Sequence, residues 1–109
     1  PQSRRVENRF PGADANPYVA IAVSLACGYL GMKQKIEASD PHEGDAFLEP
    51  IAVARSLEEA LRLLSEDSDL QKVLGPDFVK AYCSVKLEEF EAFNKVISSW
   101  EREYLLLNV

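Results

Sequence analysis

The stretch RRVENRFPGADANPYVAIAVSLACGYLGMKQK, residues 4–35, decides the fold, because it passes from a strand pattern to a helix pattern. Residues 4–10 place charges of alternating sign at every second position, which predicts a short strand that Pro11-Gly12 ends. Asn16-Pro17 is typical of a helix start, and the apolar run behind it predicts a helix over residues 16–38. Because the first half of this helix is apolar on every side, we expect it to be buried.

Downstream of this helix, the sequence predicts a loop and then a series of capped helices. Residues 39–55 are rich in proline and glycine, and we expect them to form a long loop. Residues 56–109 are predicted to be a helical region, because Ser56, Ser68 and Ser98 each precede a Glu or Gln by three positions. The expected helices cover residues 56–65, 68–75 and 76–97, with a short helix from residue 98. The chain is therefore predicted to be mostly α-helical, with one short N-terminal strand and about four to five helices.

Charge and composition exclude several classes of partner. The formal net charge of −6 and the pI of about 4.8 argue against binding to nucleic acid. The longest apolar run, residues 18–27, is broken only by Ser24 and is too short to span a bilayer, which takes about 20 apolar residues. We interpret Cys27 and Cys83 as small buried thiols, which favours a reducing compartment, the cytoplasm. Because a strand pattern begins almost at residue 1, which is not Met, we expect a piece of a larger protein.

The strongest candidate for chemistry is the face of the predicted strand that carries Arg5, Glu7 and Arg9, with Asn8 on the opposite face. Side chains on one face of a strand recur about every 6.6 Å, and a carboxylate or phosphate fits between such neighbours. A guanidinium group binds two oxygens of such an anion, and a Glu oxygen is the hard ligand that Mg²⁺ prefers. A solvated strand face with weak ion pairs shows the same pattern, and spacing alone favours that interpretation.

Two further groups of residues admit both a functional and a structural interpretation. His42 lies among Asp40, Glu43 and Asp45, which fits a metal site and also a turn rich in Pro, Gly and Asp; we favour the turn. An aromatic series near the C-terminus fits a ligand-stacking wall, although a core or a subunit interface is more typical of such spacing. Its members are Phe90, Phe93, Trp100 and Tyr104.

The motif Arg5-Val-Glu7-Asn-Arg9, followed by Pro11 and by Ala15-Asn16-Pro17-Tyr18, resembles the C-terminal part of class I glutamine synthetases. Those enzymes carry an Arg-x-Glu-x-Arg strand, then a Pro, and then an Asn-Pro-Tyr segment that opens a buried helix. The segments SLEEAL, residues 56–61, and FVKAYCSVKLEEF, residues 78–90, are also similar, so that the resemblance covers essentially the whole chain. It implies that residues 1–109 are the C-terminal, helical portion of an α+β catalytic domain.

Within this family, two segments are most similar to the γ-glutamylpolyamine synthetase branch, whose best-known member acts on putrescine. They are ENRFPGADANPY, residues 7–18, and VISSWEREYLLLNV, residues 96–109. The resemblance implies an ATP-dependent ligase that joins the γ-carboxylate of glutamate to ammonia or a polyamine through γ-glutamyl phosphate. In such a reaction the protein mainly positions the reactants and neutralises charge.

The resemblance also implies a role for each residue of the motif. Glu7 is expected to bind a divalent cation, Mg²⁺ or Mn²⁺, Arg5 to contact an ATP phosphate, and Arg9 to contact glutamate or the acyl phosphate. Both arginines are thus expected to be catalytic. Members of the family assemble into rings, which implies a homo-oligomer, and the apolar segment from Leu105 is a candidate for part of that interface.

One carboxylate and two arginines do not assemble the whole reaction, because the family uses further metal-binding carboxylates and a nucleotide pocket upstream. We therefore expect the chain on its own to be inactive. The alternative interpretation is a non-catalytic helical interaction or oligomerisation module. In that case the strand face is a salt-bridged edge, and the aromatic helix binds a partner.

Overall fold

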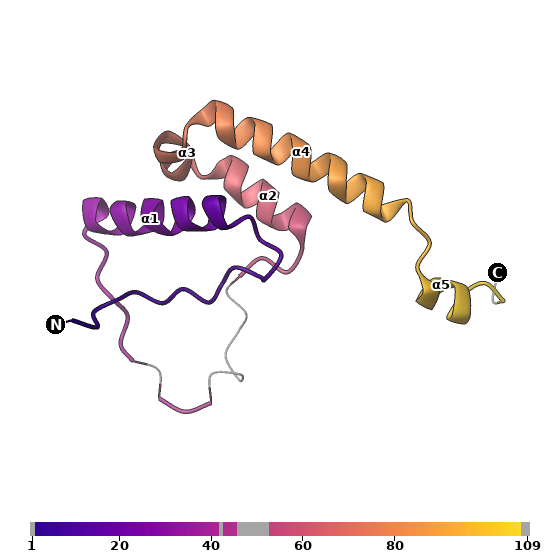
Figure 1. The fold of residues 1–109 in the computed structure, drawn as a ribbon, viewed down its shortest axis with the longest axis horizontal. Coiled ribbons are helices and arrows are strands. Elements are labelled where there is room, and N and C mark those ends of the chain that lie inside the picture. The colour runs from indigo at the N-terminus through magenta and orange to yellow at the C-terminus, as the bar shows by residue number, and fades with distance from the viewer. Residues whose placement is uncertain (1, 42, 46–52, 108–109) are drawn as a thin grey trace.

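The computed structural model describes residues 2–41, 43–45 and 53–107 (Figure 1). This part of the chain is helical, which confirms the prediction of a mostly α-helical fold. The helices are α1 (Pro17–Gln34), α2 (Leu57–Glu66), α3 (Ser68–Leu74), α4 (Pro76–Asn94) and α5 (Ser99–Tyr104). None of these helices is long and apolar enough to cross a bilayer.

The predicted strand over residues 4–10 is wrong: no described residue belongs to a strand. Residues 4–10 instead form an extended chain that runs beside α1 without regular structure (Figure 1). The physical reason is that a strand is defined by backbone hydrogen bonds to a partner. The described part of the chain supplies no partner strand, and a period-two pattern cannot create one.

Local side-chain bonds start α1, as the sequence predicts. The Asn16 side chain accepts hydrogen bonds from the backbone N–H groups of Tyr18 at 3.0 Å and Val19 at 3.3 Å, and Pro17 occupies the first turn. The end of α1 differs from the prediction, because the helix stops at Gln34 rather than near residue 38. Lys35 adopts a left-handed conformation with φ 53°, and the next N–H groups turn back to carbonyls of the last turn.

The later helices also begin at side-chain caps. Ser56 caps α2, and Ser98 forms a complete capping box with Glu101 at the start of α5, as predicted. The cap of α3 differs, because Asp67 rather than Ser68 accepts from the N–H groups of the first turn. The helix α4 ends at Asn94, before the predicted residue 97, and its last carbonyls bond the N–H groups that follow.

The packed part of the molecule is formed by α1 to α4. The helix α2 packs along α4, α3 touches both of them, and α1 joins this group through α3 (Figure 1). The Gln34 side chain also donates to an Asp69 carboxylate oxygen at 3.0 Å, which ties the end of α1 to α3. Among the described residues, the buried apolar side chains are one from each of α1, α2 and α4: Ala26, Leu61 and Val79.

In the described chain α1 is largely uncovered, since Ala26 is its single buried residue. Cys27 is exposed and Cys83 is half-buried, so the prediction of two buried thiols is wrong for Cys27. The face turned away from α3 instead carries exposed apolar side chains, among them Tyr18, Ile21, Leu25 and Met32. An apolar helix is buried only where other elements cover it, and among the described helices α3 alone contacts α1.

Candidate functional site

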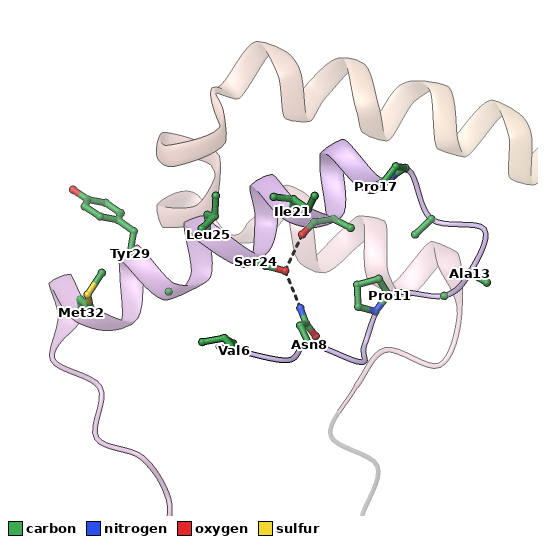
Figure 2. A pocket seen from close by; sticks show the side chains of 14 residues that line it. Val6, Asn8, Pro11, Ala13, Pro17, Ile21, Ser24, Leu25, Tyr29 and Met32 are labelled. Atoms are coloured by element: carbon green, nitrogen blue, oxygen red, sulfur yellow. Dashed lines mark hydrogen bonds between the residues drawn. The ribbon is translucent and has the colours of Figure 1, made fainter. Parts of the chain in front are cut away.

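The candidate site lies on the extended segment before α1, and one side chain connects that segment to the helix. Asn8 Nδ2 donates to Ser24 Oγ at 2.8 Å (Figure 2). Asn8 Oδ1 accepts from the backbone N–H of Phe10 at 3.1 Å. Ser24 Oγ in turn donates to the carbonyl oxygen of Ala20 at 2.8 Å. The Asn8 side chain therefore points toward α1.

Glu7 and Arg9, on either side of Asn8, are in direct contact with each other. Arg9 Nε donates to Glu7 Oε1 at 2.6 Å, and both side chains are exposed to solvent. Within the described residues, Arg5 makes no ion pair or side-chain hydrogen bond. The structure thus brings two of the three predicted site residues together and leaves Arg5 outside the pair.

Between the extended segment and α1 lies an open apolar groove of about 740 Å³ (Figure 2). Val6 and Asn8 line it from the segment, and Ile21, Leu25 and Met32 line it from α1. Glu7 and Arg9 do not line this groove but a separate hollow with Asn8 and Phe10. The charged pair and the apolar groove therefore lie on different sides of the segment.

The donor chemistry of Glu7 fits one ligand of a divalent cation, since a carboxylate oxygen is the hard donor that Mg²⁺ and Mn²⁺ take. One carboxylate is insufficient for a complete site. No cluster of three or more potential metal ligands occurs among the described residues. Among the described residues, Glu7 therefore offers a single carboxylate donor and no complete cation site.

The structure bears on one of the two alternative sites, the aromatic series, and not on the other, the possible metal site at His42. His42 lies outside the described residues, so a metal site around it stays untested. The aromatic series does not form one wall, because α5 contacts no other helix of the described chain. Trp100 and Tyr104 stack on each other with ring centroids 5.2 Å apart, whereas Phe93 is exposed on α4.

Sequence reasoning missed the contact between Asn8 and Ser24. A signal for Ser24 was present, because it is the one polar residue in the apolar run of residues 18–27. A signal for Asn8 was absent, because period two assigns it only to the side opposite Glu7 and Arg9.

Comparisons with known proteins agree on one family. The sequence matches the family described as "Glutamine synthetase, catalytic domain" over residues 1–105. It is 41% identical over 102 residues to a glutamate–isopropylamine ligase of a Pseudomonas species, an alignment that covers 89% of this chain and 22% of that protein.

Other relatives have different names for the same general type of protein. A γ-glutamylethanolamide synthetase of Streptomyces coelicolor is 35% identical over 101 residues, which is 92% of this chain and 22% of the relative. A glutamine synthetase of Vibrio cholerae is 34% identical over 113 residues, an alignment that covers 94% of this chain and 24% of that protein. The chain thus spans between a fifth and a quarter of the length of these relatives.

Proposed function

This chain belongs to the glutamine synthetase catalytic-domain family, and on that premise we propose that it is the C-terminal part of an ATP-dependent carbon–nitrogen ligase. The ligase joins the γ-carboxylate of glutamate to ammonia or to an organic amine. The observation that carries the proposal is the contact between Glu7 and Arg9 on a solvent-facing segment inside the matched residues. An anion-binding group and a hard oxygen donor are what a phosphoryl transfer to a carboxylate requires.

The proposed reaction has two steps. A γ-carboxylate oxygen of glutamate attacks the γ-phosphorus of ATP, the bond to ADP breaks, and γ-glutamyl phosphate forms. The nitrogen of the amine then attacks the acyl carbon, phosphate leaves with the carbon–oxygen electron pair, and the nitrogen loses a proton. The product is a γ-glutamyl amide.

In this scheme each residue of the motif has one task. We assign Arg9 to the carboxylate or acyl phosphate of the glutamate, because a guanidinium group can hold two oxygens of one anion. We assign Arg5 to an ATP phosphate, since no side chain of the described residues occupies it. Glu7 would hold a divalent cation, which when bound neutralises charge on the phosphates. To bind its anion, Arg9 has to break its contact with Glu7. Because that ion pair is exposed to solvent, breaking it costs little free energy.

The acceptor is proposed to be ammonia or an amine. Two relatives are named for organic amines, isopropylamine and ethanolamine, and others are named glutamine synthetases. The resemblance of residues 7–18 and 96–109 to the polyamine branch adds putrescine to the candidates. We further propose a homo-oligomer in a reducing compartment such as the cytoplasm, which fits two free cysteines.

The test is a product assay on the longer protein that contains this chain. Purified protein is incubated with glutamate, ATP and Mg²⁺ and with ammonia, isopropylamine, ethanolamine or putrescine in turn. Phosphate release and the mass of the γ-glutamyl amide are measured. We expect one acceptor to give both signals in equal amounts. Phosphate release that is independent of glutamate, with no amide from any acceptor, would contradict the proposed function.

A further inference from the structure

The side chain of Asn8 is held at two points, by its own chain and by α1. Its oxygen accepts from the Phe10 N–H at 3.1 Å, which fixes the side chain against the turn that follows. Its amide nitrogen donates to Ser24 Oγ at 2.8 Å, across 16 positions of sequence (Figure 2). Within the described residues, no other side-chain hydrogen bond joins residues 2–12 to α1.

The chemistry of Ser24 makes it a suitable acceptor. Its hydroxyl proton is directed at the Ala20 carbonyl oxygen, 2.8 Å away, so the lone pairs of the oxygen remain for the Asn8 amide. A serine inside a helix commonly bonds the carbonyl four residues earlier, and this alone gives no reason for a polar residue in an apolar run. The second bond, to Asn8, supplies that reason.

This contact determines which way the neighbouring charges face. Among the described residues no strand pairs with the segment, and the Asn8–Ser24 bond is the side-chain contact that orients it against α1. In an extended chain adjacent side chains point to opposite sides. Because the Asn8 side chain bonds Ser24 of α1, the side chains of Glu7 and Arg9 are directed away from the helix. There Arg9 Nε lies 2.6 Å from Glu7 Oε1.

We propose that Asn8 and Ser24 are positioning residues, which orient Glu7 and Arg9 for the cation and the glutamate without touching either. This inference rests on the proposed function of Glu7 and Arg9. Loss of the contact leaves the two charged side chains present but allows the segment to rotate. Small misplacements of binding groups reduce the rate and weaken binding together.

The decisive experiment uses Ser24→Ala in the longer protein, with Ser84→Ala as the matched control. Ser84 makes the same bond to the carbonyl four residues earlier, Lys80 at 2.9 Å, but within the described part of the chain its side chain bonds no other element. Alanine is favourable inside a helix, so neither variant should prevent folding. Ser24→Thr keeps the hydroxyl and serves as the rescue variant.

We expect Ser24→Ala to raise both the KM for glutamate and the Mg²⁺ concentration for half-maximal activity by about five- to tenfold, as for one lost hydrogen bond. Ser24→Thr should restore values within twofold of wild type, and Ser84→Ala should not differ from wild type. A merely structural role would lower kcat by reducing the amount of folded enzyme and would leave the KM unchanged. That result, or unaltered kinetics, would overturn the inference.

A second measurement does not depend on activity. Hydrogen exchange of the Phe10 N–H, which donates to Asn8 Oδ1 at 3.1 Å, measured by mass spectrometry of the peptide with residues 4–12, should be faster in Ser24→Ala than in wild type and unchanged in Ser84→Ala. Equal exchange in all three proteins would show that the contact does not hold the segment and would overturn the positioning role. A wild-type protein that forms no γ-glutamyl amide contradicts the proposed function itself. An active wild type with unaltered Ser24→Ala kinetics contradicts the positioning role alone.

Discussion

At the scale of single residues, the contact between Glu7 and Arg9 adds little to stability. Both side chains are exposed, at 54% and 86%, and ion pairs of this kind contribute about 0–1 kcal/mol. The two groups therefore exchange partners at small cost. If a cation and an anionic substrate bind here, Glu7 and Arg9 separate and each takes the ligand of opposite charge.

A pair of substitutions tests whether Glu7 does more than join a surface ion pair. Glu7→Gln in the longer protein should lower Mg²⁺-dependent γ-glutamyl transfer by about a hundredfold, because a neutral amide is a poor ligand for a hard cation. Glu66→Gln is the matched control, since Glu66 also meets an arginine, Arg62, at 2.6 Å with similar exposure. Activity is measured across a range of Mg²⁺ concentrations.

Glu66→Gln should leave activity within twofold, and both variants should change the free energy of unfolding by less than about 1 kcal/mol. Normal activity of Glu7→Gln with a normal Mg²⁺ dependence would exclude Glu7 as a ligand.

The residue pattern predicted part of this arrangement. The period-two pattern placed Asn8 on the side opposite Glu7 and Arg9. In the structure the Asn8 side chain bonds α1, and Glu7 and Arg9 contact each other. The partner of Asn8 was not predictable, because Ser24 lies 16 positions away and meets it only through the path of the chain around Pro11. The roles of Arg5, Glu7 and Arg9 stay predictions that rest on family resemblance.

At the scale of helices, the connection between α3 and α4 depends on the backbone of one residue. Gly75 has φ 94° and ψ 122°, a region that residues with a Cβ atom rarely enter. A Cβ atom added there would meet no atom within 4 Å, so the cost of a substitution is conformational rather than steric.

Gly75→Ala should therefore lower the free energy of unfolding by about 1–3 kcal/mol, measured by urea denaturation and followed by helical circular dichroism. Gly31→Ala is the control, because Gly31 lies in α1 without a positive φ and its Cβ atom would also meet nothing. We expect it to raise stability by about 0.5–1 kcal/mol, as alanine does inside helices. An equal effect of both substitutions would contradict the assigned role of the Gly75 backbone.

The helix α5 carries a carboxylate whose ionisation supports its first turn. The Ser98 backbone N–H bonds Glu101 at 2.7 Å and, together with the Ser98 hydroxyl, lowers the pKa of Glu101 below its usual value. A carboxylate whose pKa is lower in the folded than in the unfolded state stabilises the folded state at pH values above its unfolded pKa. This stabilisation is lost as the pH falls through the folded pKa. We expect α5 to loosen below about pH 4.5.

Fluorescence reports this transition, because Trp100, the one tryptophan, lies in α5 and stacks on Tyr104. A titration from pH 7 to pH 3 should change its emission in wild type. Glu101→Gln keeps a neutral acceptor for the Ser98 N–H and should remove most of that change. Identical titrations of the two proteins would show that the capping box does not depend on charge.

Helix starts were predictable from sequence because a cap lies within three residues of the groups it bonds. Asn16 and Ser98 are examples, and each bonds N–H groups of its own first turn. The strand over residues 4–10 and the burial of α1 were not predictable, because both depend on elements that pack alongside. A helix that is apolar all round indicates that covering elements are needed and does not identify them.

At the scale of the whole molecule, the chain is more open than its length requires. Its radius of gyration is 18.4 Å, whereas a compact domain of this length has about 13 Å. Its accessible surface is 10201 Å², against about 6,000 Å² for a compact protein of this mass. Exposed apolar side chains of α1 and the separate position of α5 account for part of the excess (Figure 1).

The last prediction follows from this openness together with the composition of the site. The 109-residue chain on its own should produce no γ-glutamyl amide and no glutamate-dependent phosphate from ATP, with any acceptor that the longer protein uses. Among the described residues, Glu7 lies in no cluster of potential metal ligands, and the Glu7–Arg9 hollow is open to solvent. Water around exposed charges weakens each electrostatic contact that a phosphoryl transfer needs. The assay compares chain and longer protein at equal concentration, and turnover by the chain alone would show that the described residues suffice for catalysis.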